Sequence, residues 1–230
     1  IWMGSKQDGL FRLERTGNDR FKIRQFTRQK DDPYSLSYNS IYTIFQDSKS
    51  RIWLGCYGGG LNLIEETQEG EIRFLHSGNK LTGYSKERFA KVRYITEANR
   101  VLLVGTTEGL LTFSSEFTQP EQIEFYRNIR IPDKVSSLCS NDVIYIYTDS
   151  RKDTYVLSFT GGLNKILSEN LLSDQIEFKT YTTQNGLPSD LVESMIEDNK
   201  GNLWIIAENA LACFHPEKET FEHYDKKYLQ

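Results

Sequence analysis

Residues 52–61 have the sequence IWLGCYGGGL, and similar sequences recur at four other places in the chain. Each copy centres on an aromatic or aliphatic anchor, and a Leu follows the anchor seven or eight positions later. Self-similarity at a fixed period is typical of repeat architectures, in which each repeat is one small structural unit. The anchors recur every 49 to 52 residues and are Trp2, Trp53, Leu103, Tyr155 and Trp204.

The second copy predicts four short strands within one repeat. β-branched and aromatic residues fill the segments, and a polar turn, DSKSR, and three glycines, Gly58 to Gly60, separate them. Glycine suits the second turn because it adopts positive φ without steric cost. The predicted strands cover residues 41–46, 52–56, 61–64 and 72–75. The corresponding fourth strands of the five repeats are predicted at residues 21–26, 72–75, 123–126, 176–181 and 221–224.

Four strands in each of several repeats predict an all-β fold of antiparallel, four-stranded β-propeller blades. The chain opens inside the second strand of a repeat, so only four first strands are expected against five of each other kind. We therefore expect a partial propeller, a single segment over residues 1–230 that belongs to a longer array. The approximate blades are residues 1–40, 41–90, 91–142, 143–191 and 192–230.

Composition narrows the function classes. The 230 residues carry a formal net charge of -4, which argues against nucleic acid as a partner. No run approaches the roughly 20 apolar residues of a membrane span. Three widely spaced cysteines, Cys56, Cys139 and Cys213, indicate neither a disulfide framework nor a zinc site, and we expect buried thiols.

Acids open several of the predicted turns. Asp47, Asp149 and Asp198 each stand six residues before an anchor, where a short carboxylate can accept backbone N–H groups two residues on. Calcium binding is the alternative, but these turns lack the several carboxylates of a site with six to eight oxygen ligands. Trp53 and its counterparts could stack on sugars, but their fixed place in the repeat favours a role in the blade core.

Three stretches of the chain resemble the two-component regulator propeller repeat. They are QDSKSRIWLGCYGGGLNLIE at residues 46–65, FKTYTTQNGLPSDLVESMIED at residues 178–198 and EDNKGNLWI at residues 197–205. The third and fourth repeats depart from the pattern, since Leu103 and Tyr155 replace the anchor Trp. The resemblance covers essentially the whole chain.

This resemblance implies a location and a role. Such repeats fill the periplasmic sensor region of hybrid two-component systems, chiefly in gut Bacteroidetes, where two seven-bladed propellers precede an immunoglobulin-like domain, a membrane span, a histidine kinase and a response regulator. It implies an oligosaccharide ligand, further blades and a second propeller in the same chain, and a homodimer of the full-length protein. The segment itself is expected to be no enzyme, although the full-length protein would be a histidine kinase.

Topology predicts where a ligand would bind. The loops between second and third strands, and those from a fourth strand to the next first strand, emerge on the same face of a propeller, and specificity usually resides in such variable loops. Amide and carboxylate groups beside an aromatic ring would suit a sugar. The candidate ligand-binding residues are Lys6, Asn39, Tyr57, Glu108, Asn141, Phe159, Asp190 and Asn209. Asn39, Asn141 and Asp190 could instead be caps that satisfy backbone donors between blades.

No catalytic residue, metal site or cofactor is predicted. HExxH and GxSxG motifs are absent from the sequence, and the acids are scattered. Two other functions stay open beside the sensor. A propeller-fold polysaccharide lyase or glycosidase would need clustered acids or a base, and a protein-interaction scaffold would need a contiguous exposed apolar patch.

Overall fold

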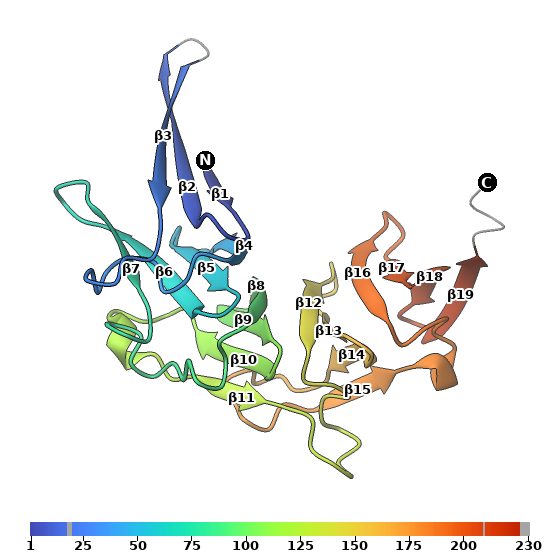
Figure 1. The fold of residues 1–230 in the computed structure, drawn as a ribbon. Helices are drawn as coiled ribbons and strands as arrows, with labels where there is room; N and C mark the ends of the chain where they lie inside the picture. Colours follow the sequence, from blue (N-terminus) through green and yellow to red (C-terminus); the bar gives the residue numbers. More distant parts are fainter. Residues whose placement is uncertain (18–19, 209, 226–230) are drawn as a thin grey trace. The chain divides into compact units, whose positions relative to one another are not determined.

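The computed structural model describes residues 1–17, 20–208 and 210–225. These residues form five antiparallel sheets, as predicted, with two short 3₁₀ turns (Figure 1). The first sheet has three strands in the order β1-β2-β3, and each of the others has four. No described helix is long and apolar enough to cross a membrane.

The strand bounds follow the repeat. The first sheet comprises β1 (Trp2–Gly4), β2 (Leu10–Gly17) and β3 (Arg20–Phe26). The second comprises β4 (Ile41–Gln46), β5 (Ile52–Cys56), β6 (Gly60–Glu66) and β7 (Ile72–Leu75). The third comprises β8 (Val92–Ala98), β9 (Val101–Thr106), β10 (Gly109–Ser114) and β11 (Tyr126–Asn128). The fourth comprises β12 (Val143–Thr148), β13 (Thr154–Ser158), β14 (Gly162–Ile166) and β15 (Phe178–Tyr181). The fifth comprises β16 (Val192–Glu197), β17 (Leu203–Ala207), β18 (Ala210–His215) and β19 (Thr220–Asp225).

The fourth strand of the third sheet was predicted at residues 123–126, which is wrong because β11 begins three residues later, at Tyr126. The 3₁₀ turn Pro120–Gln122 precedes it, and the amide of Ile123 donates to the carbonyl of Pro120 at 3.3 Å. Proline at the start of this turn presets the backbone φ and cannot donate to a ladder. Pairing therefore begins only at Tyr126, which lies opposite Thr112 of β10.

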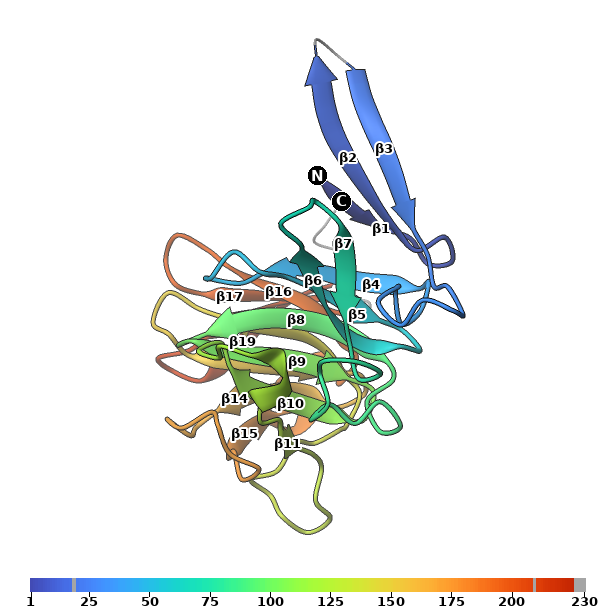
Figure 2. The same cartoon turned by 90° about the vertical axis from the view of Figure 1, so that its left-hand side faces the viewer.

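The chain divides into two compact units. The first contains residues 1–104 and 113–125, and the second contains residues 105–112 and 126–230, so the third sheet contributes strands to both. In the first unit, β2 and β3 form a long hairpin that extends beyond β1 (Figure 2). A buried cluster of this unit joins Leu10 of β2 to Leu54 of β5 and Phe74 of β7.

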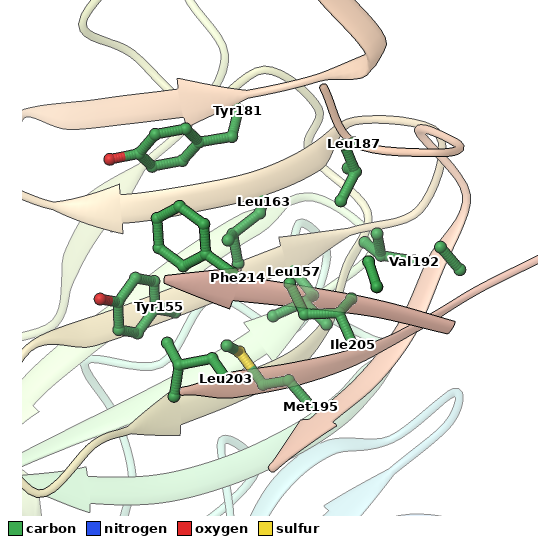
Figure 3. Close-up of a cluster of buried hydrophobic side chains, with 12 residues drawn as sticks. Tyr155, Leu157, Leu163, Tyr181, Leu187, Val192, Met195, Leu203, Ile205 and Phe214 are labelled. Carbon is green, nitrogen blue, oxygen red and sulfur yellow. The ribbon is translucent and has the colours of Figure 1, made fainter. Parts of the chain in front are cut away.

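The core of the second unit is formed by buried side chains from all the strands β13 to β18 (Figure 3). Tyr155, Leu157, Leu203 and Phe214 are all fully buried in it. Truncating one such leucine to alanine would cost about 2–5 kcal/mol, because the lost apolar contact leaves a cavity. The alternating apolar residues of each repeat are thus the residues that hold these sheets together.

The acidic turns are confirmed. The Oδ1 atom of Asp47 accepts the amides of Lys49 and Arg51, at 3.0 and 2.9 Å. Asp149 and Asp198 accept the amides two and four residues on in the same way. Each carboxylate closes its turn with backbone donors.

Of the anchors, Trp53 is fully buried, as expected for a core residue, whereas Trp2 and Trp204 are half-buried. The thiols of Cys56 and Cys213 are buried as predicted, but Cys139 is only half-buried. Burial raises the pKa of Cys56 to about 12, so this thiol stays protonated at neutral pH.

Candidate functional site

Two tyrosines of the first unit stack on each other at the end of the second sheet. The rings of Tyr42 and Tyr57 have centroids 4.5 Å apart and planes inclined by 20°. Tyr57 directly follows β5, and its amide donates to the carbonyl of Ser40 at 2.8 Å. This bond keeps the chain after β5 beside the start of β4, which carries Tyr42. We call Tyr42 and Tyr57 the tyrosine pair.

A β-bulge orients Tyr42. Ile41 lies opposite Cys56 and Thr43 lies opposite Gly55, so Tyr42 has no residue opposite it in β5. Bulges commonly re-aim a side chain next to a binding site. Ile41 is buried, whereas the side chain of Tyr42 is 43% exposed. The bulge recurs in the fourth and fifth sheets, where Ile144 and Glu193 take the equivalent place.

Cationic side chains lie over the outer faces of the tyrosine pair. The Nζ atom of Lys6 is 6.0 Å from the ring centroid of Tyr42. On the other side, Lys91 Nζ and the Arg93 guanidinium lie 5.3 and 5.6 Å from the centroid of Tyr57. These distances are typical of cation–π attraction. Lys6 and Lys91 have no carboxylate partner among the described residues.

The glycine turn after Tyr57 is set by backbone geometry. Gly58 and Gly60 have φ values of 123° and 76°, which favour glycine. Their amides both donate to the carbonyl of Ala90, at 2.7 and 2.9 Å. A Cβ on Gly58 would lie 2.9 Å from the ring of Tyr38, so the close approach of this ring also favours glycine at position 58. The turn fixes the chain immediately after the tyrosine pair.

Three of the predicted ligand residues hold loops together. The Oδ1 atoms of Asn39 and Asn141 accept the amides of Arg28 and Arg130, at 2.6 and 2.7 Å. Asp190 accepts the amide of Thr183 at 2.7 Å. In each case the donor lies two residues beyond the end of a fourth strand. Their side-chain oxygens are thus engaged as caps, the alternative that the sequence left open.

The other candidates are distributed between the two units. Lys6 and Tyr57 are brought into one cluster by Tyr42, which the sequence did not single out. Glu108 and Phe159 lie in exposed turns of the second unit, and the Phe159 side chain is 50% exposed. Asn209 lies outside the described residues.

Sequence reasoning missed Tyr42, Lys91 and Arg93. Tyr42 follows the buried Ile41, so strand alternation could have indicated that Tyr42 is exposed, but not that its ring stacks on Tyr57. The bulge and the antiparallel bridge between Tyr57 and Lys91 could not be read from spacing. No group of three or more His, Cys, Asp or Glu side chains suited to a metal ion lies among the described residues.

A family model described as "two component regulator propeller" matches residues 35–58 and 186–209. The chain contains two-component regulator propeller repeats. The first match includes both members of the tyrosine pair and the cap Asn39. No curated protein matches the chain in sequence.

Solved structures share the fold of these repeats. An extracellular domain assigned to a hybrid two-component system of B. thetaiotaomicron is 18% identical, with a TM-score of 0.68, and the match covers 97% of this chain and 29% of that one. A second such domain from B. thetaiotaomicron is 18% identical with a TM-score of 0.64, covering 98% of this chain and 27% of that one. Virginiamycin B lyase from Staphylococcus aureus is 14% identical with a TM-score of 0.60, covering 97% and 65%.

These likenesses confirm the predicted β-propeller fold. The chain spans less than a third of the two-component domains that it matches.

Proposed function

We propose that this chain is a ligand-sensing segment of the extracytoplasmic region of a hybrid two-component system. The observation that carries the proposal is the pair of family repeats at residues 35–58 and 186–209. The similar domains from B. thetaiotaomicron are assigned to such systems, which supports it. The proposal includes a periplasmic location, further blades in the same chain, a homodimer and a kinase elsewhere in the protein.

The proposed ligand is an oligosaccharide, and the tyrosine pair is its contact surface. Aromatic rings with polar tips offer sugars an apolar face together with a hydrogen-bonding hydroxyl. The Nζ atom of Lys6 lies 6.0 Å from the ring centroid of Tyr42, and this residue is 43% exposed. A sugar that stacks on Tyr42 would compete with this lysine for the ring.

The chain is proposed to bind its ligand without transforming it. A sensor needs a ligand that binds two arrangements of the protein with different affinity, because equal affinity shifts no equilibrium. A lyase or glycosidase would instead need a base or a carboxylate pair at the bound sugar. Product formation therefore separates these two functions.

The experiment is a thermal-unfolding screen of the chain against plant and host oligosaccharides, with the sugars recovered and separated by chromatography. A ligand at a hundred times its Kd stabilises by about 2.7 kcal/mol, which is a readily measured shift in Tm. The sensor predicts a shift with unaltered sugar. Altered sugar, or no shift with any oligosaccharide, contradicts the proposal. Tyr57→Ala should reduce the shift, and Phe21→Ala, at an aromatic residue of β3 that is 50% exposed, is the matched control that should leave it unchanged.

A further inference from the structure

A polar cavity of about 490 Å³ lies in the first unit, and neither member of the tyrosine pair lines it. Residues 28–37, which follow β3, form one wall, and residues 76–87, which follow β7, form the other. Its volume lies within the range of small-molecule sites, about 300–1,000 Å³. The residues that carry the argument are Arg28, Lys30, His76, Ser77, Thr82 and Lys86.

The cavity has an excess of positive charge. Arg28, Lys30 and Lys86 line it, against the carboxylates of Asp32 and Glu87. In the described part of the chain, no ion pair joins any of these three cations to a carboxylate. A recess with a net positive charge attracts anions from solution.

The two lining acids leave a formal excess of one positive charge. Asp32 uses its Oδ1 atom to accept the amide of Tyr34 at 2.8 Å, which closes the loop. By contrast Lys80, on the same connecting segment but outside the lining, forms an ion pair with Glu121 at 2.6 Å. The cations of the cavity are thus left available, while a neighbouring lysine is neutralised.

The positive charges of the cavity also act on His76. Its Nδ1 atom accepts the amide of Gly78 at 3.0 Å, so the neutral ring carries its proton on Nε2. Burial lowers the pKa of His76, and the charges of Lys86 and Arg28 lower it further. The imidazole is therefore neutral at pH 7 in a cationic recess. A bound anion would reverse the effect of these charges.

The second unit supplies an internal comparison. Residues 130–139 repeat residues 28–37, and a cavity of about 320 Å³ lies beside them. Ser35 and Ser137 accept the amides of Gln29 and Ile131, both at 2.9 Å, so the loops are held in the same way. The second wall contains the apolar Ile131, Val135 and Leu138 together with two cations, Arg130 and Lys134, and one acid, Asp133. Both recesses therefore have a formal excess of one positive charge, and the first differs in its larger volume and its third cation.

We propose that the cavity between residues 28–37 and 76–87 binds a small organic oxyanion, whose carboxylate or sulfate group contacts Arg28, Lys30 and Lys86. Hydroxyl groups of Ser77 and Thr82 would bond the uncharged part of the molecule. This site is independent of the tyrosine pair, so it stands or falls separately from the proposed oligosaccharide surface.

The test is calorimetric titration of the chain with glucuronate, glucose 6-sulfate and neutral glucose. At least one anion should bind, glucose should not, and added salt should weaken the binding. Binding of glucuronate alone identifies a carboxylate as the ligand group, and binding of glucose 6-sulfate alone identifies a sulfate. Equal binding of glucose, or no binding of either anion, would overturn the proposal.

Variants locate the site. Lys86→Met, which keeps the apolar stem, should weaken anion binding by about tenfold, the equivalent of one charge-assisted contact. Arg28→Met should act in the same direction, and Lys134→Met in the second cavity is the matched control. The imidazole of His76, followed by NMR, should titrate at higher pH when the anion is bound. An unchanged affinity in both Lys86→Met and Arg28→Met would also overturn the proposal.

Discussion

The indole N–H of Trp53 donates to Oδ2 of Asp47 at 2.9 Å, across six residues of chain. Trp204 and Asp198 make the same bond at 3.0 Å. Because Oδ1 of each aspartate accepts turn amides, one carboxylate closes the turn and also satisfies the anchor of the following strand. The fixed spacing of six residues between acid and tryptophan therefore has a physical cause.

Asp47→Ala should destabilise the first unit by about 3 kcal/mol, since it leaves a buried indole N–H and two amides without their acceptor. Arg51 also loses its 2.7 Å ion pair with Asp47. Urea unfolding of the variant checks the value. Asp198→Ala should cost less, because Trp204 is half-buried. A loss below about 1 kcal/mol for Asp47→Ala would contradict this role of the carboxylate.

Asn39→Ala should cost about 1 kcal/mol, because the amide of Arg28 loses its 2.6 Å acceptor. Asn39→Asp should be tolerated, since Asp190 accepts the amide of Thr183 with the same atom. Thermal unfolding of the two variants separates a cap from a ligand contact. If Asn39→Ala left stability unchanged and only weakened ligand binding, the cap would not be the role of this side chain.

Gly58→Ala should destabilise the turn after the tyrosine pair through two effects. Its φ of 123° is strained for alanine, and the new Cβ meets the ring of Tyr38 at 2.9 Å. Gly70→Ala is the matched control, since its φ is 78° but nothing lies within 4 Å of the added Cβ. Strain alone costs about 1–3 kcal/mol, and Gly58→Ala should exceed Gly70→Ala in chemical unfolding. Equal losses would show that Tyr38 yields freely.

Acid should destabilise the first unit through His76. The pKa of His76 is lowered below 6.5 in the folded protein, chiefly by burial, so below pH 6.5 the unfolded chain binds a proton that the folded chain does not. Stability is then lost as the pH falls from 6.5 towards the lower folded value. His76→Gln should flatten this part of the curve when unfolding is measured between pH 7.5 and 5. An unchanged slope would assign the acid sensitivity to other groups.

Much of the fold could be predicted because each blade reuses one pattern. In the second sheet, β4, β5 and β7 match the predicted ranges to the residue. The remaining strand, β6 (Gly60–Glu66), is longer than predicted by three residues. The failure at residues 123–126 has a local cause, since a proline-led turn delays pairing until Tyr126. Periodicity reports which residues are apolar but not where hydrogen bonding to a neighbour begins.

The candidate site was harder to predict. Loop topology indicated Tyr57 and Lys6, but the residue that joins them, Tyr42, is presented by a bulge that spacing does not reveal. Asn39 and its counterparts were ambiguous because an amide or a carboxylate can cap a loop as well as bind a sugar. The geometry around Arg28 and Arg130 shows that Asn39 and Asn141 cap loops, while a ligand contact by either residue stays a prediction.

The central claim, that this chain binds an oligosaccharide on the tyrosine pair without transforming it, is tested most directly by calorimetric titration. The sugar would be the one that most raises the Tm, and the double variant Tyr42→Ala, Tyr57→Ala would be compared with the unaltered chain. Two lost aromatic contacts of about 1 kcal/mol each predict an affinity at least tenfold weaker, with intact sugar recovered from both samples. Equal affinities, or cleaved sugar, would contradict the account.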